Sequence, residues 1–78
     1  MARGYVLLEV ETGAIPRIAQ QIRQIAGVIA VDSVTGPYDI ITQVETDDPR
    51  GIGRVVIEHL HSIPGVLQTI TCLTIDQY

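Results

Sequence analysis

The sequence contains no tryptophan, no phenylalanine and no lysine, and it has a single cysteine in 78 residues. Cys72 has no second cysteine for an internal disulfide, and no cysteine or histidine lies near it in sequence at the spacing of a metal site. Because its neighbours are apolar, we expect Cys72 to pack as a small hydrophobic side chain. A domain of this size usually needs staples or partners, so self-association is the expected source of extra stability.

Positive charge is scarce as well. The five basic residues are arginines dispersed at positions 3, 17, 23, 50 and 54, and the net charge is −4. Nucleic-acid binding needs a clustered basic surface, so we expect no direct contact with nucleic acid. No stretch approaches the roughly 20 apolar residues of a membrane span, and the first residues lead into a strand-like run rather than a secretion signal. We therefore expect a soluble cytoplasmic protein without membrane contact.

Aliphatic residues are what the chain has in excess. Apolar residues make up 46% of it, and most are Ile, Val, Leu and Ala spread along every segment. At this length a hydrophobic core rarely supplies more than about 3–5 kcal/mol. A thin two-layer domain cannot bury this much apolar surface, which favours a homodimer.

The second half of the chain repeats the first. The offset is larger at the last block than at the first two, so the second copy carries extra residues around its helix. Two units are too few for a solenoid, which favours duplication of one supersecondary unit. The repeated blocks are Val10-Glu11-Thr12, Pro16-Arg17 and Ile25-x-Gly27-Val28, followed by Val44-Glu45-Thr46, Pro49-Arg50 and Ile63-x-Gly65-Val66.

Hydrophobic periodicity and turn residues predict six elements in the order βαββαβ. Two βαβ halves with right-handed crossovers give a four-stranded antiparallel sheet in the order 4-1-3-2, with both helices on one face. The predicted fold class is α+β, ferredoxin-like, as one domain over residues 1–78. The expected strands are Tyr5–Glu11, Val28–Thr35, Tyr38–Thr46 and Val66–Ile75, and the expected helices are Ile15–Ala26 and Pro49–Ile63, the second capped by Asp48.

One face of this sheet has no helix to cover it. Neither side of the outer strands is purely polar, so the uncovered face should present an apolar patch of a kind that monomers rarely expose. We expect two copies to pack sheet to sheet. On the last strand, strict alternation predicts that one side carries Val66, Ile70 and Cys72 and the other side carries Leu67, Leu73 and Ile75. On the first strand, one side should carry Val6, Leu8 and Val10 and the other side Tyr5 and Leu7.

The segment Gly36-Pro37-Tyr38-Asp39 lies at the seam between the two halves and has no counterpart in the first half. A plain hairpin turn explains it equally well. However, loops on rigid scaffolds often carry sites, and glycine N–H groups beside a carboxylate complement the carboxylate and ammonium of an amino acid. The hairpin is therefore the first candidate binding site.

Two further pairs of residues are candidates. Thr69 and Thr71 share one face of the last strand, where their hydroxyls can bond a ligand, although threonine also simply suits strands. His59 and His61 lie about 200° apart on a helix and cannot chelate one metal. We expect structural roles for both, with His61 facing water, while catalysis by Asp39 with either histidine remains an open alternative.

Two motifs of the chain resemble the ligand-binding module of the Lrp/AsnC family, the regulation-of-amino-acid-metabolism (RAM) domain. Thr35–Asp39 followed by Ile40-Ile41 and Val44 is similar to the family's Gly-x-aromatic-Asp hairpin. Ile63–Val66 with Thr69-x-Thr71 is similar to its Leu-Pro-Gly-Val…Thr-x-Thr ending. The resemblance covers residues 4 to 76. Pro37 departs from it, because the family more often has a small polar or acidic residue there.

The resemblance implies a dimeric α/β-barrel-type fold whose dimers assemble into rings such as octamers, with amino acids bound between dimers. By position, Gly36, Tyr38 and Asp39 would hold the main-chain charges of the effector. Thr69 and Thr71 would line the pocket, from a neighbouring subunit. Family regulators also carry an N-terminal helix-turn-helix domain, whereas this chain begins at the first strand, so a module without that domain is expected.

The leading hypothesis is an amino-acid effector-binding and oligomerisation module. It would regulate transcription of amino-acid metabolism indirectly, together with full-length Lrp/AsnC regulators, with no cofactor and no catalysis. The first alternative is a small enzyme of the dimeric α/β-barrel type, such as a cofactor-free monooxygenase or isomerase, which needs polar groups inside each monomer. The second is a purely structural oligomerisation module, which would form rings without responding to ligands.

Overall fold

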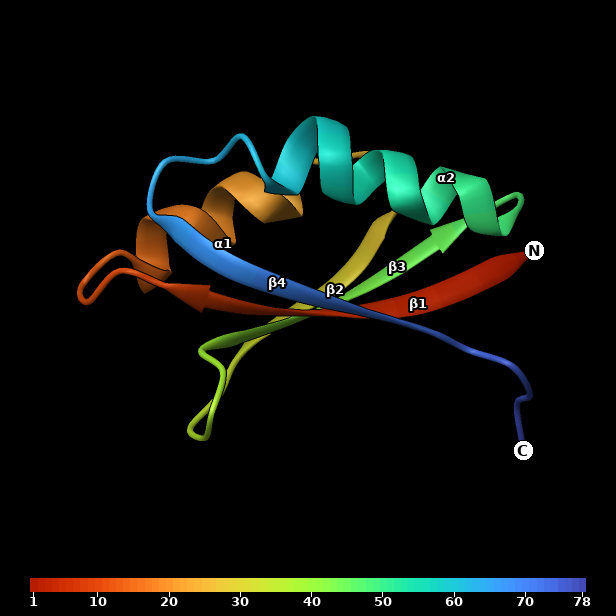
Figure 1. Cartoon of the computed structure of the whole chain (residues 1–78), viewed down its shortest axis with the longest axis horizontal. Helices are drawn as coiled ribbons and strands as arrows, with labels where there is room; N and C mark the ends of the chain where they lie inside the picture. Colours follow the sequence, from red (N-terminus) through yellow and green to blue (C-terminus); the bar gives the residue numbers. More distant parts are fainter.

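The computed structural model describes residues 1–78 and contains a four-stranded antiparallel sheet with helices on one face only (Figure 1). The strand order is β2-β3-β1-β4. The predicted element order, sheet order and placement of the helices are confirmed. The strands are β1 (Ala2–Val10), β2 (Val28–Ser33), β3 (Ile40–Thr46) and β4 (Val66–Leu73), and the helices are α1 (Ile15–Arg23), α2 (Pro49–Arg54) and the π-helical η1 (Val55–Leu60). No helix is long and apolar enough to cross a membrane.

Several element boundaries differ from the predicted ones. β1 begins three residues earlier than expected, at Ala2, because β3 runs on to Thr46 and pairs with it. α1 ends at Arg23, because the Gln24 N–H bonds Gln21 O, only three residues back, which closes the last turn. β4 ends at Leu73, and after one further bond from Thr74 N to Arg3 O the remaining residues leave the sheet.

The hydrophobic core lies between the sheet and the helix layer. The central strands β1 and β3 direct every second side chain toward the helices, and each helix contributes one apolar stripe. Burying a side chain of this size stabilises the fold by about 1.5–3 kcal/mol relative to exposing it. The largest apolar side chains with no exposed surface are Val6, Leu8, Ile18, Ile22, Ile40, Val44, Ile52 and Leu60.

The second helix differs from the regular α-helix that its apolar stripe predicted. It begins as expected, with the Asp48 carboxylate accepting a hydrogen bond from Gly51 N at 3.1 Å. Beyond Arg54 the helix widens, and His61 N bonds Val56 O five residues back at 2.9 Å. A π-helical turn accommodates an inserted residue, which agrees with the extra residues in the second copy of the repeat. Ile57, on this segment, lies off the apolar stripe and is 69% exposed.

The predicted orientation of Val66 on β4 is wrong. We expected Val66 to share a face with Ile70, but the register of β4 against β1 shifts between Glu9 and Val10, so that Val66 pairs with Val10 and Leu67 is bulged. The bulge adds one residue and reverses the alternation. Val66 therefore packs against the core on the helix side, while Leu67 is 59% exposed.

Two glycines of α2 provide a matched test of this packing. A Cβ at Gly51 would lie 2.7 Å from the Thr46 Cβ, whereas a Cβ at Gly53 would meet nothing within 4 Å. Gly53→Ala should stabilise the fold by about 0.5–1 kcal/mol through helix propensity. Gly51→Ala should destabilise it despite the same propensity gain, because the Thr46 hydroxyl is held on Asp48 O at 2.6 Å. Urea unfolding at one fixed protein concentration measures the unfolding free energy of both variants. Equal changes in the two variants would contradict the close contact between Gly51 and Thr46.

Candidate functional site

Asp39 fastens the β2–β3 hairpin to β1. Its N–H donates to Leu8 O at 2.9 Å, and its Oδ2 accepts from Val10 N at 2.9 Å. The pairing of β1 with β3 ends at Leu8, so the carboxylate continues the ladder by one side-chain bond. Within the chain, Oδ1 of Asp39 takes part in no hydrogen bond, which leaves one carboxylate oxygen for a ligand.

The hairpin tip projects below the sheet, on the side away from the helices (Figure 1). Gly36 and Pro37 are exposed and Tyr38 is half-buried. A Cβ at Gly36 would meet no atom within 4 Å, so the backbone there is open to a ligand. Pro37 has no N–H, but the Gly36 N–H makes no backbone hydrogen bond and is a free donor at the tip. Gly36, Tyr38 and Asp39 are thus all on this hairpin, with the Asp39 side chain turned to β1.

The two threonines lie on the other side of the sheet. Thr69 pairs with Leu8 and Thr71 with Val6, two β1 residues that face the helices. His61 is exposed, as predicted, and its Nε2 also lies 2.9 Å from Thr69 Oγ1 on the sheet. Thr71 is exposed. Within one chain the structure therefore does not bring the hairpin and the threonines together.

The other candidate residues do not come together into one site within the chain. The Asp39 carboxylate bonds the backbone of Val10, and neither histidine contacts it. No group of three or more His, Cys, Asp and Glu side chains is arranged to hold a metal. The buried core holds one polar side chain, Thr42, whose Oγ1 has no partner, and sequence patterns did not indicate it. Cys72 is exposed and not packed as predicted, because it points to the uncovered face of the sheet.

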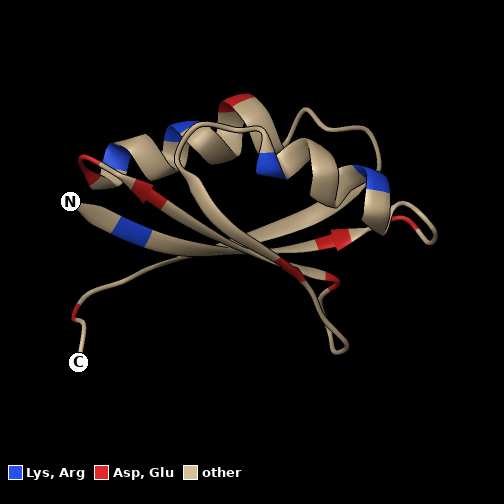
Figure 2. Ribbon diagram, turned by 180° about the vertical axis from the view of Figure 1, so that it is seen from behind, with Lys and Arg blue, Asp and Glu red and all other residues tan.

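The uncovered face carries an apolar row with a polar border. Ile41, Leu7 and Ile70 follow one another across β3, β1 and β4, and the adjoining row is Gln43, Tyr5 and Cys72. An ion pair of 2.9 Å between Arg3 and Glu45 borders these rows, and its hydrogen bond raises the pKa of Arg3. Figure 2 shows acidic and basic residues toward the ends of the strands and on the helices.

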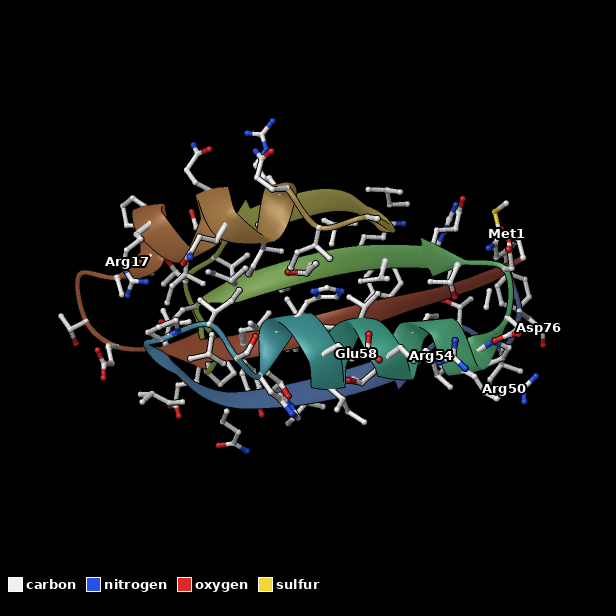
Figure 3. All side chains as sticks on the ribbon, turned by 90° about the horizontal axis from the view of Figure 1, so that it is seen from above. Met1, Arg17, Arg50, Arg54, Glu58 and Asp76 are labelled. Atoms are coloured by element: carbon white, nitrogen blue, oxygen red, sulfur yellow. The ribbon has the colours of Figure 1, made fainter.

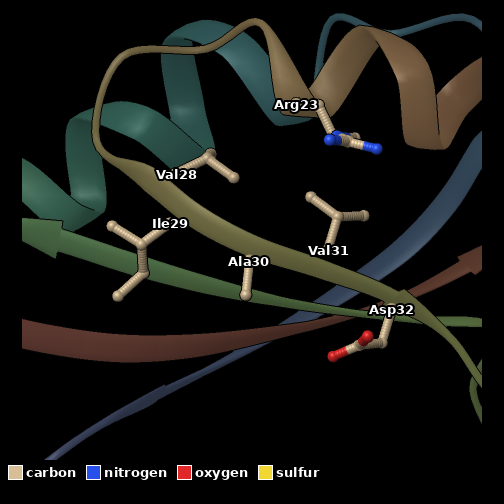
Figure 4. A pocket seen from close by; sticks show the side chains of 6 residues that line it. All are labelled: Arg23, Val28, Ile29, Ala30, Val31 and Asp32. Atoms are coloured by element: carbon tan, nitrogen blue, oxygen red, sulfur yellow. The ribbon is translucent and has the colours of Figure 1, made fainter.

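A hollow of about 410 Å³ follows the outer edge of β2 (Figure 4). Arg23 reaches over Val31 from the end of α1, while Asp32 points to the opposite side of the strand. Arg23 forms no ion pair or side-chain hydrogen bond. Sequence reasoning missed this charged edge, because the residues come from different elements.

Comparison with known proteins points to one family. The model of the Lrp/AsnC ligand binding domain matches residues 3–78. An uncharacterised helix-turn-helix-type transcriptional regulator of Pyrococcus abyssi is 37% identical over 60 residues, which are 77% of this chain and 40% of that protein. A homocitrate synthase of Sulfurisphaera tokodaii is 33% identical over 60 residues, 77% of this chain and 13% of the enzyme. The chain thus spans less than half the length of these curated relatives.

Solved structures share the fold over the whole chain. A Thermus thermophilus protein is 31% identical with a TM-score of 0.95, covering 100% of this chain and 98% of its own. A Neisseria meningitidis transcriptional regulator, solved as a complex with L-Met, is 18% identical with a TM-score of 0.87, covering 97% of this chain and 51% of that one. At that identity the second match shows the fold alone.

The role of Asp39 in the hairpin is open to a direct test. Asp39→Ala removes the acceptor of the Val10 N–H, and losing a hydrogen bond to a charged, half-buried group should cost about 1–3 kcal/mol of unfolding free energy. Asp39→Asn keeps a carbonyl acceptor and should cost less. Denaturant unfolding compares the two, and equal stability of Asp39→Ala and wild type would show that this bond contributes nothing.

Proposed function

This chain belongs to the Lrp/AsnC ligand-binding domain family, and from that membership we propose that it is an amino-acid effector-binding and oligomerisation module that regulates transcription indirectly. The observation that carries the proposal is the hairpin, where Asp39 keeps one carboxylate oxygen without a hydrogen-bond partner and Gly36, three residues before it, has an unpaired N–H. These two groups have opposite polarity. They complement the ammonium and carboxylate that every α-amino acid carries.

In the proposed complex, Asp39 Oδ1 accepts a hydrogen bond from the effector's ammonium while Oδ2 stays on Val10 N. The Gly36 N–H donates to the effector's carboxylate, and the half-buried ring of Tyr38 closes one side of the site. Charge-assisted hydrogen bonds of this kind are about twice as strong as neutral ones. The L-Met bound by the Neisseria meningitidis regulator supports the choice of ligand class.

Thr69 and Thr71 complete the proposed pocket from a neighbouring subunit. In one chain they face the helices, whereas the hairpin projects away from them. A site that uses both groups must therefore form between chains. Ligand binding and assembly then depend on each other.

The uncovered face of the sheet is the proposed contact of the homodimer. Its apolar row of Ile41, Leu7 and Ile70 runs across three strands, and the face has no helix of its own. Packing two such faces removes this apolar surface and the exposed Cys72 from water. We propose that these dimers assemble further into a ring, with an octamer as the expected size.

The proposed regulatory role is indirect. A net charge of −4 with five dispersed arginines offers no basic surface for DNA. The curated regulators extend well beyond the matched part, so we propose that the module co-assembles in the cytoplasm with full-length Lrp/AsnC regulators. The apolar interior argues against an enzyme site within the monomer, and the match to homocitrate synthase involves 13% of that enzyme.

Effector binding is tested by thermal unfolding with each amino acid in turn. At a ligand concentration of 100 times Kd, one site should gain about 2.7 kcal/mol, which is readily measured in a domain this small. Asp39→Asn, which keeps the Val10 bond, should abolish the gain, while Asp32→Asn on β2 should keep it. If the whole panel produces no stabilisation and no change in solution mass, a structural oligomerisation role is the better description.

The sheet-face dimer is tested with a charge at its centre. Leu7→Glu buries a carboxylate in the proposed contact and should dissociate the dimer, because an unpaired buried charge is strongly unfavourable. Gln20→Glu, on the exposed side of α1, introduces the same charge in the helix layer, away from the contact, and should leave the mass unchanged. Sedimentation equilibrium measures both. An unaltered mass for Leu7→Glu, with its circular dichroism intact, would place the dimer contact elsewhere.

A further inference from the structure

The two outer edges of the sheet are protected to different degrees. Natural sheets shield free edges with charges, proline or bulges, because an open edge pairs with other strands. The β2 edge has a register shift at Ile29, the guanidinium of Arg23 overhead and Asp32 beside it. The β4 edge is eight residues long, with the sequence VLQTITCL, and contains neither a charge nor a proline. Its one irregularity is the bulge at Leu67.

The hydrogen-bonding groups on the β4 edge follow from its pairing with β1. Thr74 N bonds Arg3 O, so Gln68, Ile70 and Cys72 turn their N–H and C=O groups toward β1. In an antiparallel pair the intervening residues turn theirs outward. The backbone groups of Thr69, Thr71 and Leu73 therefore point away from the sheet without a partner. They form a row of free donors and acceptors along a mostly exposed strand.

We propose that a second copy of this chain pairs with that edge, β4 against β4, antiparallel about a two-fold axis at Ile70. In this register Thr69 lies opposite Thr71 of the partner subunit, and Leu73 lies opposite Leu67 of the partner subunit. Threonine pairs and aliphatic pairs across strands both stabilise a sheet. Ile70 meets its own symmetry mate in a non-hydrogen-bonded pair, where side chains approach most closely. The edge is self-complementary, which favours a second copy over a foreign strand.

The helix layer above the edge has a matching surface. Seen from above the helices, β4 runs along the outer side of α2 and η1 (Figure 3). Ile57 is 69% exposed on η1 and adjoins a shallow groove between this helix and β4. Pairing two β4 edges brings the two η1 segments side by side, so that Ile57 and the groove lose contact with water. The groove is lined by Pro49, Gly53, Val56, Ile57, Thr71 and Leu73.

The β4 contact adds a second two-fold interface to the proposed sheet-face dimer. Two different two-fold contacts on one protomer give a closed ring of dihedral symmetry when their axes intersect at a suitable angle, and an open filament when they do not. The inference rests on the proposed function only for this ring closure, because β4 pairing itself requires neither the effector nor the sheet-face contact. It also places Thr69 and Thr71 at a contact between subunits.

The experiment uses an edge proline. Thr71→Pro removes an N–H that points outward, which an edge strand tolerates, and it should reduce the solution mass to that of the sheet-face dimer. Thr71→Val keeps the N–H and should retain the assembly. Ser33→Pro introduces the same substitution on the β2 edge and should leave the solution mass unchanged. Mass is measured without amino acids, and circular dichroism confirms that each variant is folded.

A cross-link identifies the register. In a Cys72→Ser background, chains with Thr69→Cys and chains with Thr71→Cys are mixed and treated with a short bifunctional maleimide. The mixture should yield covalent dimers at least several-fold above either chain alone. A Thr71→Pro protein with wild-type mass, or a mixture without cross-link, overturns the β4 contact even if amino acids bind. If the wild-type protein is monomeric and the mixture gives no cross-link, both the β4 contact and the sheet-face dimer are overturned. Thermal stabilisation of the same sample by amino acids then tests effector binding separately.

Discussion

The fold depends on one constraint: the helices cover one face of the sheet, whereas the central strand β1 carries apolar side chains on both faces. In β1, Val6 and Leu8 have no exposed surface beneath the helices, while Tyr5 and Leu7 alternate with them on the other side. Alternation of period two fixes this division and allows no rearrangement within one chain. The stability gained on the helix side is therefore inseparable from the apolar surface left on the other, and this surface is the one that the proposed dimer uses.

The internal repeat explains the scaffold, and its imperfections explain the special features. The two halves supply equivalent strands and helices, joined at a hairpin that has no counterpart in the first half. The second copy is longer: its helical segment runs from Pro49 to Leu60, against Ile15 to Arg23 in the first, and includes the π-helical turn of η1. On this helix Ile57 is exposed while Leu60 is buried. Duplication thus accounts for the fold, whereas the hairpin and η1 are where surface properties differ.

The fold was largely predictable, because strand alternation, helix stripes and glycine turns are local signals that agree with one another. The errors came from insertions of single residues. The bulge at Leu67 reversed the predicted side of Val66, and the π-turn replaced a regular helix, because neither has a reliable local signal. The hairpin residues were identified from their unusual composition. The bond from Val10 N to Asp39 and the contact of His61 with Thr69 join distant segments, so only the folded structure reveals them.

Val10 connects two features of the molecule that otherwise lie apart. Its N–H is held by the Asp39 carboxylate, and its own pairing with Val66 is the point where β4 changes register. A ligand that draws on Asp39 therefore acts on the residue that sets the alignment of the outer strand. Thermodynamic reciprocity applies to such a linkage: if occupancy of the hairpin alters the free energy of aligning β4, then fixing β4 alters ligand affinity by the same factor. One backbone amide would then be the element through which concentration of a small molecule is converted into quaternary structure.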